Sequence, residues 1–290
     1  MLLAAGCGGD NKPANSFTAK FQQYQSDPNA EAAARNLSAL ALQQKEKADT
    51  AGGERSLEAA SKRAGELKAG DGRATAFNAI ASAQGQFGLR TDCRKSLKEV
   101  QESIDKMSND EARAKALARM ALSFESYLDD ANQSKHYFSE AEKAAKKAGD
   151  APAQARSLLE ISRYLSFSKN AEQKPAAVRL ITEAKGIATS IQEDRARIDA
   201  LAEIVVTLEK GGNKAEATVS LEEATKAAKA ITAPASRAHA FIDLAERTRE
   251  IGRRDESVKL FDEALAASKE VPDPSLKSEV ENRLDRSRKG

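Results

Sequence analysis

The chain has 290 residues, of which 40% are hydrophobic, although aromatic residues make up only 4% and Trp is absent. The apolar content comes mainly from Ala, Leu and Ile among many Lys, Glu and Arg, a mixture that favours long helices. The 46 basic and 44 acidic residues leave a net charge of +2, which argues against binding to a nucleic-acid backbone. The absence of an apolar run of about 18 residues argues against a membrane-spanning helix.

The first residues contain a short motif that ends at Cys7. Residues 3–7 (Leu-Ala-Ala-Gly-Cys) resemble the lipobox of bacterial lipoproteins, in which small residues precede a cysteine that receives lipid. The resemblance implies lipidation of Cys7, with residues 1–15 as a disordered tether. Only six residues precede Cys7, fewer than the basic start and apolar stretch of a signal peptide need. Two interpretations stand: a signal that begins upstream of Met1, or a disordered tail with a spare cysteine.

We assign residues 16–288 to one solenoid, in which a repeat of about 40 residues recurs over residues 29–271. A column of large apolar residues recurs, with apolar or small residues three, seven and ten positions after each, which is the stripe of an amphipathic helix. We call this the second helix of each repeat. The column is Leu57, Leu97, Phe138, Ile181, Leu221 and Phe261. Cys93 stands four residues before Leu97, at a small position of the same helix, so we expect it to fill a core site.

A first helix precedes each second helix. Its large apolar anchors are Phe77, Leu117, Leu158, Leu201 and Phe241. In the first repeat the stripe is weaker, and we expect Ala39 and Leu42 to form it. We therefore predict an all-α fold, a solenoid of about six stacked helix-turn-helix repeats with a C-terminal capping helix at 275–286. The predicted repeats are 29–69, 70–108, 109–149, 150–192, 193–232 and 233–271.

The order of small and large residues in the second helix resembles the signature of tetratricopeptide repeats. A small residue is followed by a large apolar residue four positions later and by Ala three positions after that, as at Ala217, Leu221 and Ala224. The resemblance covers about residues 29–271. It departs from the family in its longer unit of about 40 residues instead of 34, its scarce aromatic residues and its mostly missing final proline. It implies that the first helices line a surface that binds a protein or peptide.

Two charged columns follow the same period. An arginine stands four residues before most first-helix anchors, and we expect it to bond the terminal carbonyl groups of the preceding helix. These arginines are Arg35, Arg73, Arg113, Arg197 and Arg237. The second column, to which we assign no partner, is Glu99, Glu140, Glu183, Glu223 and Glu263.

A helical wheel selects the residues that point away from the buried stripe of the first helices. The selected set is Lys115, Arg119, Arg156, Arg163, Asp199, Glu203, His239, Asp243 and Glu246. These positions predict a binding groove that turns from basic to acidic along the chain. The alternative is a solvated ladder, in which Arg163 and Glu203 pair across neighbouring repeats.

No pattern of residues that supports catalysis is evident. The two histidines, His136 and His239, stand about a hundred residues apart, and no phosphate loop, paired Cys motif or H-E-x-x-H motif is present. We expect no catalytic, cofactor-binding or metal-binding residues. The leading hypothesis is a lipid-anchored, extracytoplasmic scaffold that binds a protein or peptide, and not nucleic acid. The alternatives are a soluble cytoplasmic adaptor or regulator and, third, an enzyme.

Overall fold

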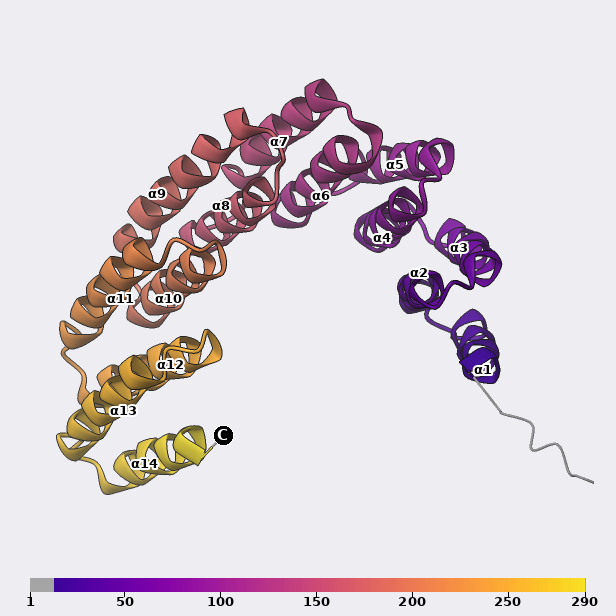
Figure 1. Ribbon diagram of the computed structural model, residues 1–290. Helices are drawn as coiled ribbons and strands as arrows, with labels where there is room; N and C mark the ends of the chain where they lie inside the picture. The colour runs from indigo at the N-terminus through magenta and orange to yellow at the C-terminus, as the bar shows by residue number, and fades with distance from the viewer. Residues whose placement is uncertain (1–12, 290) are drawn as a thin grey trace, which may run out of the picture. The chain divides into compact units, whose positions relative to one another are not determined.

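The computed structural model describes residues 13–289, so Cys7 and most of the expected tether lie outside the described residues. Residues 13–289 hold fourteen α-helices, one short 3-10 helix and no strand, which confirms the all-α class (Figure 1). The α-helices are α1 (Pro13–Gln25), α2 (Ala30–Glu46), α3 (Thr50–Gly65), α4 (Asp71–Phe87), α5 (Arg90–Ile104), α6 (Asp110–Leu128), α7 (Ala131–Ala145), α8 (Ala151–Ser166), α9 (Lys174–Ser190), α10 (Asp194–Lys210), α11 (Lys214–Lys229), α12 (Pro234–Glu250), α13 (Arg254–Lys269) and α14 (Pro274–Lys289). The 3-10 helix, η1 (Ala171–Gln173), lies between α8 and α9.

The helices pack in two compact units, whose boundary runs through α6 and the start of α7. The first unit contains the described residues up to 108, together with 119–134. Within it, α2 pairs with α3 and α4 pairs with α5, while α2 also packs on α4 (Figure 1). The helix α1, to which the repeat pattern assigned no role, packs against α2 and α3.

The second unit contains residues 109–118 and the chain from residue 135 onward. Within it, α8 pairs with α9, α10 with α11, and α12 with α13. The first helices α8, α10, α12 and α14 pack successively on one another, and α14 also covers part of α13. The predicted stacking of helix pairs and the C-terminal helix are therefore confirmed.

The core follows the predicted apolar columns. All six large residues of the second helices are buried, from Leu97 at 1% exposure to Ile181 at 8%. The first-helix anchors from Phe77 to Phe241 are buried as well. The small residues beside them let helices approach closely: a Cβ atom added at Gly53 in α3 would lie 2.4 Å from the ring of Phe87.

The stripe of α2 differs from our expectation. Ala39 is exposed and Leu42 is only half-buried, whereas Leu37, Leu40 and Ala41 are completely buried. The prediction was wrong because the repeat spacing of 40, counted back from the anchor Phe77, falls on Leu37. The weak stripe that we assigned lies two residues out of register, and a shift of two residues turns a helix position by about 200°.

Arginines at the start of first helices do bond the end of the preceding helix, as predicted for the first of the two charged columns. Arg73 donates to the carbonyl oxygen of Leu67 at 2.8 Å, Arg197 to that of Ile191 at 2.9 Å, and Arg237 to that of Ile231 at 3.0 Å. Arg35 instead pairs with Glu31 in its own helix. The hydrogen bond from Lys143 is the main cause that lowers the pKa of Glu140, and the charge of Arg113 adds to it.

The structure also gives partners for the glutamate column. In the second unit, three of its members pair with lysines of the preceding second helix or the residue after it. The distances are 3.0 Å for Lys146–Glu183, 2.6 Å for Lys185–Glu223 and 2.6 Å for Lys229–Glu263. Glu140 pairs with Lys143 of its own helix, and Glu99 pairs with Arg73 within one helix pair. Three glutamates of the column therefore link consecutive helix pairs by ion pairs, each of which is weak because it is partly exposed.

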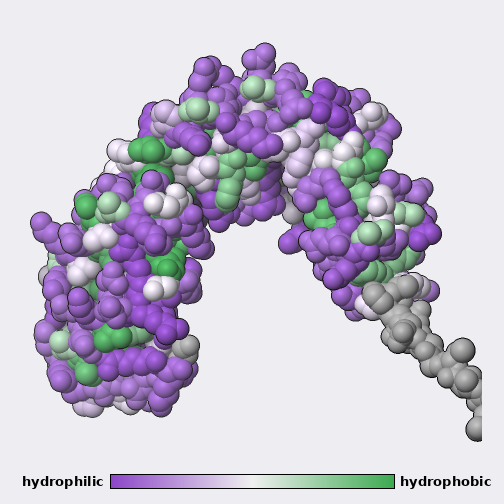
Figure 2. Space-filling view, in the orientation of Figure 1, coloured by the Kyte–Doolittle hydropathy of each residue, from purple (hydrophilic) through white to green (hydrophobic). Residues whose placement is uncertain are grey.

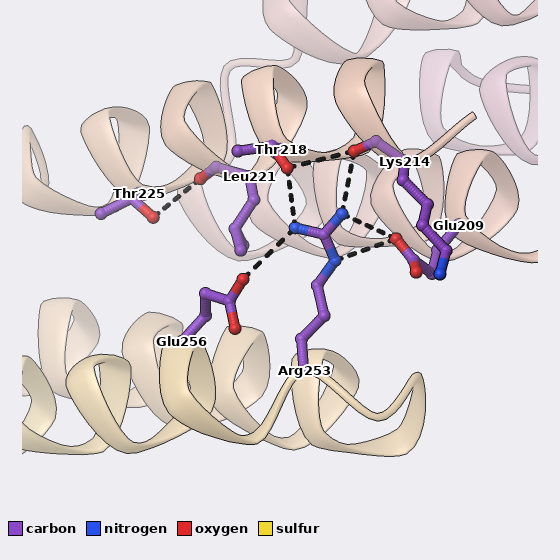
Figure 3. A network of polar contacts seen from close by, with 7 residues as sticks. All are labelled: Glu209, Lys214, Thr218, Leu221, Thr225, Arg253 and Glu256. Carbon is purple, nitrogen blue, oxygen red and sulfur yellow. Dashed lines mark hydrogen bonds and ion pairs between the residues drawn. The ribbon is translucent and has the colours of Figure 1, made fainter. Parts of the chain in front are cut away.

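A stronger link joins the last two helix pairs. Arg253 precedes α13, and its side chain is only 11% exposed. Its guanidinium donates to the Glu209 carboxylate at 2.7 and 2.9 Å, to the Lys214 carbonyl oxygen at 2.9 Å and to the Thr218 hydroxyl at 2.9 Å (Figure 3). One side chain therefore joins the end of α10, the start of α11 and the start of α13.

Candidate functional site

The second unit presents one face built from its first helices. We call the outward side of α8, α10 and α12, together with residues 110–118 of α6, the first-helix face. Two hollows indent this face. The larger, of about 560 Å³, lies between α8, α10 and α12, and the smaller, of about 210 Å³, lies between α6, α8 and α10. Eight of the nine residues that the helical wheel selected belong to this unit.

At the α6 and α8 end, the basic side chains have acidic partners. The Lys115 ammonium lies 3.3 Å from the Glu160 carboxylate, and Arg163 pairs with the same carboxylate from its own helix. Arg156 lies 3.3 Å from Glu111 on α6. A ladder across helices therefore exists, but Arg163 pairs with Glu160 and not with Glu203. These pairs are half-exposed, so a charged ligand competes with them at little cost.

At the α12 end, the expected open acidic patch is occupied by the last helix. Arg283 of α14 lies between three side chains of α12: it is 3.2 Å from Nδ1 of His239, it pairs with Asp243, and it lies 3.5 Å from Glu246. Ser287 also donates to Glu246. This corrects the predicted charge distribution, because one arginine offsets much of the acidic charge of this end.

The centre of the face lies on α10 and has charges without ion-pair partners. Among the described residues, no ion pair joins Arg195, Asp199 or Glu203 to another side chain, and all three line the larger hollow. Partial burial, followed by the nearby Asp243 carboxylate, raises the pKa of Asp199. The charges of Arg195 and Arg247 act in the opposite direction, so charges of both signs surround the hollow.

His239 is the only histidine on this face. Partial burial, followed by the positive charge of Arg283, lowers its pKa below the usual value. The imidazole is therefore neutral at neutral pH, when its Nδ1 can accept a hydrogen bond from Arg283. His136, in contrast, is an exposed residue of α7 that stacks edge-on against Tyr137.

Four charged residues of this region were not among those predicted from the sequence. Glu111 and Arg195 stand four residues before Lys115 and Asp199, one turn earlier on the same faces, and extending the helical wheel by one turn would have found them. Arg247 stands four residues after Asp243 and lines the larger hollow. Arg283 lies on the helix that we interpreted only as a cap, and no periodic signal in the sequence assigns it to this face.

The remaining residues singled out from the sequence lie elsewhere. Arg119 belongs to the first unit, where it is half-buried. Cys93 is a free, completely buried cysteine, as predicted, and burial raises the pKa of its thiol from 9.0 to about 11. Within residues 13–289, no three His, Cys, Asp or Glu side chains are placed to hold a metal ion. No helix in the same range is both long and apolar enough to cross a membrane.

Comparisons with known proteins give a likeness in fold alone. No protein-family model matches the chain. No curated protein matches it either. The structure is similar to the crystal structure of Ton1535 from Thermococcus onnurineus NA1, with a TM-score of 0.50 and 12% sequence identity, over 94% of this chain and 96% of that chain. At such low identity, the likeness supports the all-helical fold and carries no function.

Proposed function

We propose that the chain is a non-enzymatic scaffold that binds a protein or peptide on the first-helix face of the second unit. The observation that carries the proposal is the larger hollow, which presents Arg195, Asp199 and Glu203 without ion-pair partners among the described residues. Side chains of a folded surface usually satisfy such charges locally or in water. Unpaired charges of both signs around one hollow suit a ligand that carries both signs as well.

The size of the hollow favours an extended segment. Packed helices lie about 8–10 Å apart, and an extended peptide advances about 3.3 Å per residue. A segment of roughly five to six residues therefore reaches from α8 across α10 to α12. A lysine or arginine of the ligand would lie between Asp199 and Glu203, and a carboxylate of the ligand would reach Arg195 or compete with Glu111 for Arg156.

The test compares binding of fluorescent peptides of nine residues with and without a central lysine. We expect the variant Asp199→Asn/Glu203→Gln to weaken binding of the lysine peptide by about tenfold, which corresponds to about 1.4 kcal/mol. Binding should also weaken as salt rises. The control is Glu222→Gln, a change of the same kind at an exposed residue of α11. Equal affinity for both peptides, or no loss in the double variant, would contradict the proposal.

We further propose, from the motif at residues 3–7, that Cys7 carries a lipid and holds the scaffold on the outer side of a bacterial membrane. The experiment expresses the gene from its natural start in a bacterium with a lipoprotein pathway and separates the extract into detergent and aqueous phases. The wild-type protein should enter the detergent phase, and Cys7→Ser should move it to the aqueous phase. A wild-type protein found in the aqueous phase favours the alternative, a soluble cytoplasmic adaptor or regulator.

A further inference from the structure

The end of the second unit holds a hollow that does not belong to the first-helix face. It has a volume of about 850 Å³ and lies between α12, α13 and α14. We call it the terminal socket. Its walls include the apolar Val258, which is 59% exposed, and Phe261, and its rim includes Arg249, Arg254 and Lys289. Hydrophobic patches interrupt the mostly hydrophilic surface in the region of α12 and α13 (Figure 2).

One repeat earlier, the equivalent place is filled. The repeat spacing of 40 between Leu221 and Phe261 places Arg249, Arg254 and Val258 at the positions of Glu209, Lys214 and Thr218. Those three earlier residues are the ones that hold the guanidinium of Arg253, at the start of α13 (Figure 3). In the filled site, the N-cap residue of an amphipathic helix therefore occupies the place that is open in the terminal socket.

The chemistry of the two sites differs at the charged position. Glu209, which binds an arginine, is replaced by Arg249 in the terminal socket, and the hydroxyl of Thr218 is replaced by the methyl groups of Val258. Arg249 donates to the Ser287 carbonyl oxygen and lies 5.6 Å from the ring centre of Phe261. Among residues 13–289, Arg254 and Lys289 have no ion-pair partner, while Arg288 pairs with Asp262. A helix that begins with arginine would be repelled here.

We propose that the terminal socket binds an amphipathic helix of a partner protein that carries Asp or Glu at its N-cap, in the place that Arg253 takes one repeat earlier. The carboxylate would face Arg249, Arg254 and Lys289, and the apolar side of the helix would cover the exposed Val258. Asp is also a favoured N-cap residue, because its carboxylate accepts hydrogen bonds from the first backbone N–H groups of a helix. This site is independent of the first-helix face, so either proposal can fail alone.

The test uses two labelled peptides derived from the helix that fills the earlier site. The basic peptide has the sequence of residues 252–269. The acidic peptide is identical except that Arg253 and Arg254 are replaced by Glu. We expect the acidic peptide to bind the full chain at least about tenfold more tightly at low ionic strength, because opposite charges meet in the socket and like charges do not. Fluorescence anisotropy measures both affinities.

A protein variant assigns the binding to the socket. Arg254→Glu/Lys289→Glu changes two exposed side chains without ion-pair partners among the described residues, so folding should be unaffected. The preference for the acidic peptide should fall to less than about twofold or reverse. The control Lys259→Glu, at an exposed residue of α13 outside the socket, should keep it. Equal binding of the two peptides, or an unchanged preference in the double variant, overturns the proposal. So does a dimer of the wild-type chain, measured by light scattering, that the double variant abolishes, because the occupant is then a second copy.

Discussion

Single arginines link neighbouring helices by bonding backbone carbonyl groups at the ends of the helices. The last carbonyl groups of a helix have no partner within it, and a guanidinium can bond several of them at once. Arg73 and Arg197 each bond two such carbonyl oxygens, and Arg237 bonds one, at the starts of α4, α10 and α12. Arg253 instead bonds the carbonyl oxygen of Lys214 at the start of α11, and it also holds the Glu209 carboxylate, which is only 14% exposed.

Replacing Arg253 by Ala should lower the free energy of unfolding by about 3 kcal/mol, because Glu209 is then left buried without its partner. Urea unfolding followed by circular dichroism measures the change. The double variant Arg253→Ala/Glu209→Ala should recover part of the loss. The control is Arg247→Ala, which removes an exposed pair with Glu250 and should cost less than about 0.5 kcal/mol. Equal losses for the two arginines would disprove the role of Arg253.

The buried thiol of Cys93 gives a second prediction at this scale. In a Cys7→Ser background, a thiol reagent at pH 8 should leave the native protein unlabelled and should label one thiol after unfolding, because only the exposed thiolate reacts. The raised pKa of Cys93 also makes the stability of the protein depend on pH. The unfolded thiol ionises near 9.0 and the native thiol near 11, so its contribution is complete below pH 9 and is lost as the pH rises toward 11. Fast labelling of the native state would refute the burial.

At the scale of elements, the sequence predicted most of the helices because their period is strong. Each buried column requires an apolar or small residue at one position of every repeat. Such a column predicts a helix even where the helix propensity of the individual residues is ambiguous. The prediction of the buried stripe of α2 was wrong because an Ala-rich sequence allows several helix registers of similar hydrophobicity. The predicted charge distribution of the first-helix face was wrong for another reason. A helical wheel gives the direction in which Asp243 points, but it cannot show that Arg283 of another helix pairs with Asp243.

Ion pairs between second helices are expected to make the second unit sensitive to acid. Arg179, through hydrogen bonds, and Lys146 lower the pKa of Glu142 to about 2, against the ordinary value of 4.5. The stabilisation is present above pH 4.5 and is lost as the pH falls toward 2. Because Arg179 is 51% exposed, Arg179→Ala should cost at most about 1 kcal/mol at pH 7.

The difference between wild-type and Arg179→Ala protein should vanish near pH 2, and Lys174→Ala, an exposed residue of the same helix, should show no such trend. Chemical unfolding at several pH values measures these differences. A difference for Arg179→Ala that stays constant from pH 7 to pH 2 would show that Glu142 does not titrate as described.

At the scale of the whole molecule, stability is expected to be local. A stack of helix pairs is held by contacts between neighbours, so a defect is felt most by the adjacent pairs. Leu221 in α11 is 6% exposed. Replacing it by Ala should cost about 2–5 kcal/mol, whereas Lys226→Ala on the exposed side of the same helix should stay within about 0.5 kcal/mol.

Hydrogen exchange should show where that cost appears. In Leu221→Ala, the amides of α10, α11 and the pairs beside them should exchange faster, while those of α2 to α5 in the first unit should keep their protection. Uniform acceleration along the chain would show that the two units unfold as one, contrary to a nearest-neighbour stack.

The exchange of Glu209 for Arg249 has a consequence for how copies of this chain behave together. A repeating structure whose last site matched its earlier ones would accept the same kind of helix that it offers, and such head-to-tail recognition leads to open filaments. If the proposal holds, the arginine rim of the terminal socket would repel a helix that begins like α13, and the socket would not accept the corresponding helix of a second copy. The charge that favours an acidic partner helix would then also disfavour filament formation.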